Sequence, residues 1–279
     1  MRKAVAGQLA GEVGIVTGAG RGFGREIAKR LAREGAQVTL VSRNQVELHA
    51  VVQDIEAAGG QAFAATADVT DRAGVERAVA AAEAHFGPAT LLVNNAGIDR
   101  PFGPIGTVDP DEWWASHAIH ARGPLLFMGA VLPGMHRLGR GHIVNIASRG
   151  GIEVTPNMSA YGVGKATEIR LTEHVAVESL GTGVAAFSIE PGTVITSMGE
   201  ATLDNPEAHR WIPGGIAFLT MVRDAQRDPK VRDAVFERCG DMVVGLLSGR
   251  YDALTGRYLD PADDFDALLA QALASPKAG

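Results

Sequence analysis

The sequence predicts an α/β fold of the doubly wound, Rossmann-like type, in which one parallel sheet carries helices on both faces. Three observations predict it. Short apolar runs alternate with amphipathic segments along the chain, as in right-handed strand–helix–strand units. The apolar runs are continuous, which is typical of strands that are covered on both faces. A glycine-rich turn joins the first apolar run to the first amphipathic segment.

The apolar runs predict the strands, and segments with apolar residues on one stripe predict the helices between them. The predicted strands are residues 13–17, 37–41, 61–66, 90–93, 142–146 and 184–189. The predicted helices are residues 25–33, 46–58, 72–86, 110–132 and 159–180. Because no linker interrupts this alternation through residue 196, we expect residues 1–279 to form a single domain.

The last third of the chain departs from the alternation. Residues 197–249 are expected to be helical and are broken by prolines and glycines, and a final strand is predicted near residues 257–259. This insertion is either a small helical lid over a ligand crevice or a pair of surface helices. Its apolar side chains suit an apolar or cyclic ligand, and they suit ordinary packing equally well. These side chains are Met198, Leu203, Trp211, Ile212, Phe218 and Met221.

Composition excludes several classes of partner. The 279 residues carry a net charge of −6, so a concentrated basic face for nucleic acid is not expected. The single cysteine, Cys239, excludes an internal disulfide and a metal site built from several cysteines. The most apolar stretch, residues 123–135, is interrupted by prolines and is shorter than the ~18 residues of a membrane span. With no secretory signal at the start, we expect a cytoplasmic protein with no membrane partner.

The glycine-rich turn, residues 17–24 (TGAGRGFG), has the spacing of a dinucleotide site. Gly18 allows the tight turn, Gly22 lets the backbone approach a pyrophosphate, and Gly24 allows the helix to pack closely on the strand. The helix that follows would point its free N–H groups at the phosphates, and Phe23 is expected among the residues that bind the cofactor. The placement between a strand and a helix favours this interpretation over a turn without a ligand.

Residues at the end of the second strand indicate which dinucleotide binds. An NAD site usually carries an acid there, to bind the ribose 2′-hydroxyl. Here Ser42, Arg43 and Asn44 occupy that place, and Arg21 lies in the glycine-rich turn. Two guanidinium groups suit a 2′-phosphate, so the sequence predicts NADP(H) as the preferred cofactor. The alternative is that both arginines are solvated surface residues.

A tyrosine and a lysine four positions apart form a candidate acid–base pair. Tyr161 and Lys165 would lie on one face of a helix. Free tyrosine has a pKa of about 10, and a nearby ammonium favours the phenolate and lowers that pKa. Ser148 follows the strand at residues 142–146, at the strand end where open α/β sheets bind ligands. Its hydroxyl could hold a substrate carbonyl oxygen against Tyr161.

With these motifs in order, residues 8–198 resemble the classical short-chain dehydrogenase/reductase family. The resemblance rests on the glycine-rich turn, Asp68-Val69, residues 94–97 (NNAG), Ser148, Tyr161-x-x-x-Lys165, and residues 191–196 (PGTVIT). It implies an acid–base role for Tyr161. It also implies a homodimer or homotetramer formed through the long helices at residues 110–132 and 159–180.

The resemblance implies further cofactor contacts. Asp68 would contact the adenine with Val69 beside it, although Asp68 could also only cap the next helix. Lys165 would bind the hydroxyls of the nicotinamide ribose and tune Tyr161. The remaining residues would line the ribose and hold the nicotinamide carboxamide. These are Asn95, Ala96 and Gly97 at the ribose, and Pro191, Gly192, Val194 and Thr196 in the loop at the carboxamide.

Two features depart from the family pattern. His120 stands where the family has a catalytic asparagine that helps to carry a proton path to the lysine. Because imidazole donates and accepts hydrogen bonds and titrates near pH 6.5, His120 either replaces that asparagine or is a satisfied helix histidine beside a weakened relay. No third ligand accompanies His117 and His120, so no metal site is expected. The C-terminus also lacks the usual Asp-Gly-Gly, which leaves the last strand less certain.

The sequence therefore predicts an NADP(H)-dependent carbonyl reductase or alcohol dehydrogenase that acts on a small molecule. Two alternatives stay open. The same pocket could carry out a dehydration, cyclisation or isomerisation with the cofactor as scaffold, because a fold does not fix a function. The chain could also be a regulatory protein that binds the cofactor.

Overall fold

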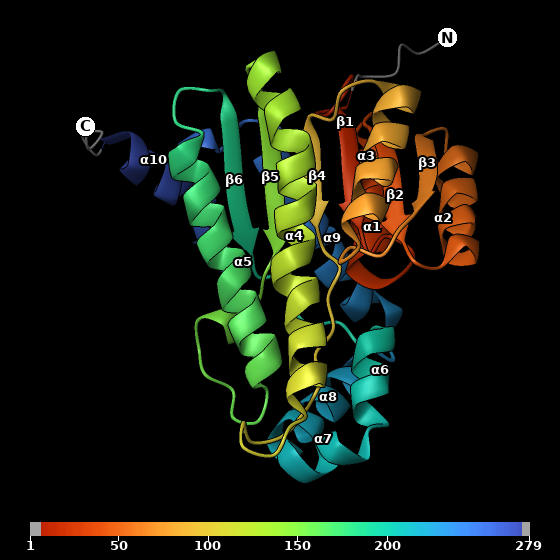
Figure 1. The fold of residues 1–279 in the computed structure, drawn as a ribbon, viewed down its shortest axis with the longest axis vertical. Helices are drawn as coiled ribbons and strands as arrows, with labels where there is room; N and C mark the ends of the chain where they lie inside the picture. Colours follow the sequence, from red (N-terminus) through yellow and green to blue (C-terminus); the bar gives the residue numbers. More distant parts are fainter. Residues whose placement is uncertain (1–6, 275–279) are drawn as a thin grey trace.

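Seven parallel strands form one sheet, in the order β3-β2-β1-β4-β5-β6-β7 (Figure 1). The computed structural model describes residues 7–274. The strands are β1 (Val13–Thr17), β2 (Gln37–Ser42), β3 (Gln61–Thr66), β4 (Leu91–Asn94), β5 (Gly141–Ile146), β6 (Val184–Ile189) and β7 (Tyr258–Leu259). The chain builds outward from β1 to β3 and then returns to place β4 on the other side of β1. This confirms the predicted doubly wound, Rossmann-like sheet, including its short last strand.

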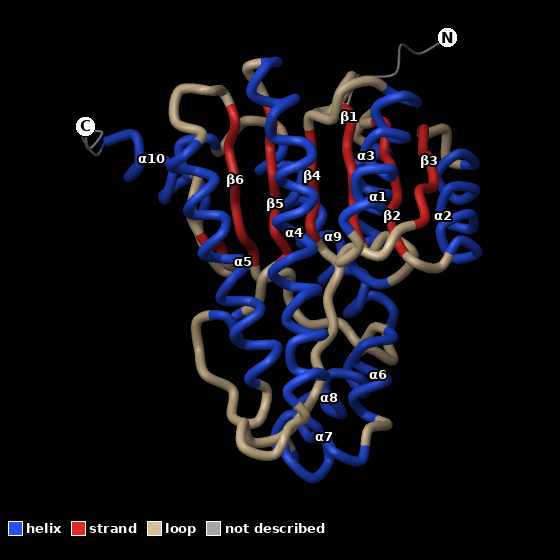
Figure 2. Tube along the Cα trace, viewed as in Figure 1, coloured by secondary structure: helices blue, strands red, loops and turns tan. Residues whose placement is uncertain are grey.

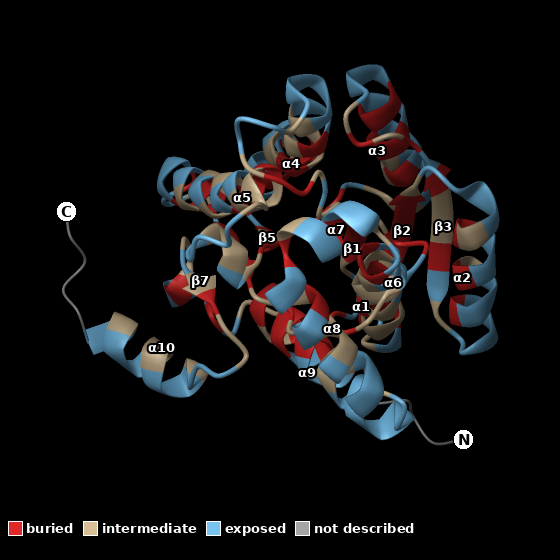
Figure 3. Ribbon diagram, turned by 90° about the horizontal axis from the view of Figure 1, so that it is seen from below, coloured by how far each residue is buried: buried red, intermediate tan, exposed pale blue. Residues whose placement is uncertain are grey.

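Helices cover both faces of the sheet (Figure 3). One face carries α1 (Gly22–Arg33), α2 (Gln45–Ala57) and α9 (Pro229–Leu247), and the other carries α3 (Arg72–Phe86), α4 (Pro110–Leu138) and α5 (Ser159–Glu178). Val16 and Val93 face the first layer, while Ile15 and Leu92 face the second, and all four are buried. The central strands are apolar on both faces because both faces are covered.

The helix at residues 110–132 was predicted too short, since α4 continues to Leu138. Pro124 and Pro133 both lie inside it, each at the cost of one backbone hydrogen bond. The helix ends where Gly139 adopts a left-handed conformation and its N–H bonds back to the last turn. Packing of buried Phe127, Val131 and Met135 against the sheet maintains the helix through these prolines.

Residues 197–249 divide into two parts that do different things. The cap helices, α6 (Ser197–Leu203), α7 (Pro206–Trp211) and α8 (Pro213–Ala225), lie beyond the carboxyl ends of the strands (Figure 2). They share a small apolar core with Phe102. In contrast, α9 packs against α1 and buries Cys239 and Val243 in the main core. Only residues 197–225 therefore match the predicted lid.

The last described element is α10 (Phe265–Ala274), which packs beside Tyr251 through Phe265. Within residues 7–274, no helix combines the length and the apolar character that crossing a lipid bilayer requires.

Candidate active site

A cavity of about 890 Å³ opens at the carboxyl ends of the central strands. Its walls are the glycine-rich turn after β1, the ends of β2, β4 and β5, the loop after β6 and the cap helices. This is the place where the strand order reverses, between β1 and β4, and where open α/β sheets bind their ligands. Every predicted catalytic and cofactor residue except Gly24 lines this cavity.

The glycine-rich turn is held in place by the start of the next loop. Gly18 has a φ of +65°, and a Cβ on Gly24 would lie only 2.3 Å from the Gly18 carbonyl oxygen. The Asn95 side chain donates to the carbonyl oxygens of Thr17 and Gly18, at 2.9 and 3.3 Å. Gly18 and Gly24 are therefore required by close packing, and Asn95 ties β4 to the turn.

The first turn of α1 leaves its backbone N–H groups free to bind an anion. Arg21 is the N-cap residue, and its side chain makes no capping hydrogen bond. Asn44, Asp71 and Asp109 do cap α2, α3 and α4 with their side chains. A helix N-terminus without a side-chain cap, which opens on a cavity beside a glycine-rich turn, fits the pyrophosphate of a dinucleotide.

The adenosine end of the cavity carries two weakly paired guanidinium groups. Arg43 lies 3.8 Å from Asp68 and is 73% exposed, and Arg21 lies 3.9 Å from Glu47 and is 65% exposed. Such exposed, long ion pairs contribute little, so both guanidinium groups remain available to a phosphate. Ser42 accepts a hydrogen bond from the Asn44 backbone, and the Asn44 side chain is engaged as the cap of α2.

Asp68 forms a turn of its own and does not cap the next helix. Its Oδ1 accepts hydrogen bonds from the Thr70 backbone N–H and hydroxyl, at 2.8 and 2.7 Å. These bonds and Arg43 lower the pKa of Asp68 from its ordinary value, although partial burial opposes them. The cap of α3 is Asp71. The second carboxylate oxygen, Asp68 Oδ2, lies 3.8 Å from the Arg43 guanidinium, and both residues line the cavity.

The other predicted cofactor residues lie in the glycine-rich turn, after β3 and β4, and in the loop after β6. Val194 is buried, Gly192 has a φ of +86°, and Thr196 stands at the start of α6, 3.2 Å from the position of a Cβ on Gly22. The Phe23 ring packs edge-on against Phe236 of α9, so it supports the turn as well as lining the cavity. Those that also line this space are Val69, Ala96, Gly97 and Pro191.

Ser148, Tyr161 and Lys165 converge in the cavity, from the end of β5 and the start of α5. A Cβ on Gly150 would lie 3.4 Å from Tyr161 Cε1 and 3.6 Å from Ser148 Oγ, which brackets the two side chains. Lys165 Nζ lies 5.7 Å from the centre of the Tyr161 ring. The structure thus brings together the hydroxyl, phenol and ammonium that the sequence singled out.

The expected lowering of the Tyr161 pKa by Lys165 is not what the structure gives. Burial raises the pKa of Tyr161 well above its ordinary value, and a hydrogen bond with Ser148 opposes this only in part. The charge of Glu168 raises it further. The physical reason is that Lys165 Nζ donates to Glu168 Oε2 at 3.0 Å and to the Ile146 carbonyl at 2.6 Å. The positive charge of Lys165 is therefore paired with the Glu168 carboxylate and does little to stabilise the phenolate of Tyr161.

A buried carboxylate that the sequence analysis missed connects Lys165 with His120. Glu168 is 1% exposed and His120 is 0% exposed. His120 Nδ1 lies 2.9 Å from Glu168 Oε1, and the His120 ring meets the Tyr161 ring edge to face at 5.6 Å between centroids. The available signal was spacing, because Glu168 follows Lys165 by three positions on the same helix face. His120 is therefore neither isolated nor a surface residue.

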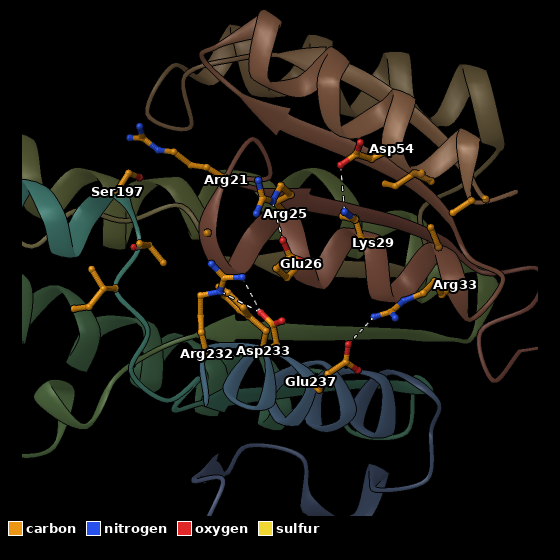
Figure 4. Close-up of a pocket in the computed structure, with 18 of the residues that line it drawn as sticks. Arg21, Arg25, Glu26, Lys29, Arg33, Asp54, Ser197, Arg232, Asp233 and Glu237 are labelled. Carbon is orange, nitrogen blue, oxygen red and sulfur yellow. Dashed lines mark hydrogen bonds and ion pairs between the residues drawn. The ribbon is translucent and has the colours of Figure 1, made fainter. Parts of the chain in front are cut away.

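A second groove lies outside the sheet, beside the same glycine-rich turn (Figure 4). Its charged side chains are paired with one another, Lys29 with Asp54 and Arg33 with Glu237, each at 3.2 Å. These pairs link α1 to α2 and to α9. The groove has none of the candidate catalytic groups, so it is not the reactive site. Within residues 7–274, no cluster of three or more His, Cys, Asp or Glu side chains could hold a metal.

The fold and this cavity define a dinucleotide-binding α/β protein, and comparison with known proteins gives its family. A family model described as short chain dehydrogenase matches residues 12–207. A short chain dehydrogenase of Pseudocercospora fijiensis is 32% identical over 271 residues, which cover 95% of this chain and 85% of the relative. The chain belongs to the short-chain dehydrogenase/reductase family of oxidoreductases.

Solved structures agree with this assignment. A gluconate 5-dehydrogenase from Burkholderia cenocepacia in complex with NADP and tartrate is 27% identical, with a TM-score of 0.75 over 90% of this chain and 94% of that one. A metagenomic short-chain oxidoreductase in complex with NADP is 36% identical, with a TM-score of 0.64 over 67% of this chain and 85% of that one.

Proposed function

We propose that this protein is an NADP(H)-dependent oxidoreductase that interconverts a carbonyl and an alcohol on a small molecule. The observation that carries the proposal is the convergence of Ser148, Tyr161 and Lys165 in one cavity with the uncapped N-terminus of α1. A phenol, a hydroxyl and an ammonium beside a dinucleotide pocket suit proton transfer that is coupled to hydride transfer.

The chain's own residues supply binding, orientation and the proton. The glycine-rich turn and the first turn of α1 would hold the pyrophosphate, and Val194 and Thr196 would hold the nicotinamide end. The bound nicotinamide supplies or accepts the hydride. In the direction of reduction, Ser148 Oγ holds the substrate oxygen and the Tyr161 O–H delivers a proton to it. The Tyr161 phenol carries its proton at neutral pH, so the proton is available for transfer to the substrate oxygen.

Preference for NADP(H) over NAD(H) follows from the charges at the adenosine end. Arg21 and Arg43 approach that end from two sides and have only long ion pairs to give up. The NADP complexes of the two related structures support the same preference. The place where an NAD site has an acid is held by Arg43, so a 2′-phosphate gains attraction there where a 2′-hydroxyl would lose its partner.

The cap helices are proposed as the substrate lid. Their apolar side chains in the cavity, including Ile212, Phe218 and Leu219, favour an apolar or cyclic substrate. Asp99 contacts these helices because its carboxylate accepts a hydrogen bond from the hydroxyl of Thr202 in α6. The cavity therefore offers an apolar wall on the cap side, and its polar groups include the Asp99 carboxylate and the Ser148 and Tyr161 hydroxyls.

A homo-oligomer in the cytoplasm completes the proposal. Exposed apolar side chains on α4 and α5, among them Leu125, Val163 and Val177, suit a helix-to-helix interface between copies. Light scattering after gel filtration would test for the dimer or tetramer. Microscopy of the tagged protein in its own cell would test the compartment.

Tyr161→Phe tests the proposed chemistry. Removal of the hydroxyl should reduce turnover by ~10²–10⁴, the usual contribution of a general acid or base. NADPH binding, followed by quenching of tryptophan fluorescence, should be retained because the ring still fills its place. A variant that keeps a near-normal rate would contradict the assignment.

A panel of carbonyls and alcohols read at 340 nm also separates the alternatives. Product without an absorbance change would favour a non-redox reaction, and NADPH binding without turnover would favour a regulatory role.

A further inference from the structure

The His120 ring occupies a space that two glycines leave open. A Cβ on Gly97 would lie 2.8 Å from His120 Cε1, and a Cβ on Gly164 would lie 2.7 Å from His120 Cβ. Gly97 follows β4 and Gly164 lies in α5 between Tyr161 and Lys165, so the ring is enclosed from both sides. An imidazole enclosed in this way has a fixed orientation, with Nδ1 against Glu168 and Nε2 against the backbone of Ile98.

The distances around the ring indicate which of its nitrogens carry protons. His120 Nε2 lies 2.7 Å from the Ile98 carbonyl oxygen, which only accepts hydrogen bonds, and this shorter of its two contacts with Ile98 favours the tautomer with the proton on Nε2. The Ile98 N–H lies farther from Nε2, at 3.3 Å. With Nε2 protonated, the 2.9 Å contact between Nδ1 and Glu168 Oε1 also requires a proton, on one atom or the other.

Among the hydrogen bonds of the described residues, the carboxylate of Glu168 has two side-chain partners, His120 and Lys165. Lys165 Nζ donates to Glu168 Oε1 and Oε2 at 3.1 and 3.0 Å. One carboxylate therefore joins an ammonium on one side to an imidazole on the other, with all three groups buried. A buried carboxylate is stable only if such partners satisfy it, so the three side chains form one unit.

We propose that Glu168 is a positioning and proton-relay residue, which holds with His120 the proton that replenishes Lys165 after Tyr161 has protonated the product. This deepens the proposed function and rests on it. His120, which stands where the family has an asparagine, would then act on Lys165 through the carboxylate of Glu168.

The proton transfers balance without an additional reactant. The Tyr161 O–H bond breaks as a new O–H bond forms on the substrate oxygen, and Lys165 Nζ–H restores the phenol. The proton between His120 Nδ1 and Glu168 Oε1 then moves to Lys165 Nζ. His120 is left neutral with its proton on Nε2, and Glu168 is left ionised. A proton from solvent refills the pair, and in the oxidation direction every transfer runs in reverse.

Other titratable groups face this unit from the surrounding elements. His117 lies on the same helix, Asp99 follows β4, and Glu190 follows β6 beyond Tyr161. Burial, and secondarily the charge of His120, lowers the pKa of His117, while burial raises the pKa of Asp99. Both shifts favour the neutral forms of these neighbours, so the charge at the centre stays with His120, Glu168 and Lys165.

Glu168→Gln removes the relay while keeping the shape of the side chain. The first readout is nuclear magnetic resonance of protein labelled with ¹⁵N-histidine and ¹³C-glutamate, without substrate, with the His120 signals assigned by their loss in His120→Asn. At neutral pH the wild type should show either a protonated imidazole or a protonated carboxyl. Glu168→Gln should show a neutral imidazole with its proton on Nε2. Glu178→Gln, which makes the same change at an exposed site on α5, should match the wild type.

The second readout is the pH dependence of carbonyl reduction. In the wild type, kcat should fall as rising pH empties the His120–Glu168 pair, and Glu168→Gln should lose that dependence. Its kcat should fall about tenfold, less than the 10²–10⁴ of a direct proton donor, while KM for NADPH and carbonyl stays unchanged. Glu168→Asp, which keeps a carboxylate, should recover part of the rate and restore the pH dependence.

Three results would overturn the proposal. They are a neutral imidazole beside an ionised Glu168 in the wild type, an unaltered His120 spectrum in Glu168→Gln, and a pH profile that Glu168→Gln leaves in place. Each of these can occur while Tyr161→Phe is inactive, in which case the proposed oxidoreductase function stands without the relay. If Tyr161→Phe is fully active, the proposed function fails, and the spectra still report whether the pair holds a proton.

Discussion

Arg43 provides a direct test of how the chain distinguishes NADPH from NADH. Its guanidinium is 73% exposed and lies 3.8 Å from Asp68, so it has no strong partner to lose when a phosphate arrives. Arg43→Ala should weaken the use of NADPH and leave the use of NADH nearly unchanged, because NADH has no 2′-phosphate to contact. Arg21, at the other side of the same space, retains part of the attraction.

The size of the effect follows from exposure. A hydrogen bond to a charged group contributes about 1.5–3 kcal/mol, and an exposed site lies at the lower end of that range because water screens it. About 1.4 kcal/mol corresponds to a tenfold change, so kcat/KM for NADPH should fall about tenfold. The difference between wild type and variant should shrink as ionic strength rises, since the screening length is about 10 Å at 0.1 M salt.

The assay is kcat/KM for NADPH and for NADH with one carbonyl substrate, at two salt concentrations. Arg77→Ala is the matched control, because Arg77 is 74% exposed and lies 3.8 Å from Asp71, yet it does not line the cavity. It should change neither cofactor's kinetics. Equal losses for NADPH and NADH in Arg43→Ala, or no loss for either, would refute the reasoning. A wild type that uses NADH as well as NADPH would refute the cofactor preference itself.

Two further predictions concern stability. Gly164→Ala should destabilise the protein, because overpacking against His120 Cβ at 2.7 Å costs about 1–3 kcal/mol and exceeds the ~1 kcal/mol gained in helix propensity. Urea unfolding would measure it, and a more stable variant would contradict the tight contact between α4 and α5. Burial raises the pKa of Asp99, so its ionised form destabilises the fold as pH rises through that raised pKa. Asp99→Asn should therefore unfold at a higher temperature than the wild type in mild alkali. The two should converge below about pH 3, where Asp99 is protonated in both the folded and the unfolded chain. A difference that is constant with pH would exclude ionisation as its cause.

The linear pattern of residues was enough to predict the sheet, the glycine-rich turn and the three side chains Ser148, Tyr161 and Lys165. These features depend on local rules that a linear pattern records. Continuous apolar runs make buried strands, glycines permit a turn such as that at Gly18, and a spacing of four places two side chains on one helix face. The carboxyl ends of parallel strands meet at one edge, so the approximate place of the site followed as well.

The division of residues 197–249, the role of Glu168 and the pKa of Tyr161 depend on three-dimensional packing. The cap helices and α9 have similar sequence patterns, and they differ because α9 packs against α1. Glu168 could have been a solvated helix residue until α4 placed His120 against it. The pKa of Tyr161 is raised because burial of the phenol and the charge of Glu168 outweigh the expected effect of the Lys165 ammonium. Burial, charge balance and the choice of packing partner depend on residues that are distant in the chain, and no local pattern encodes them.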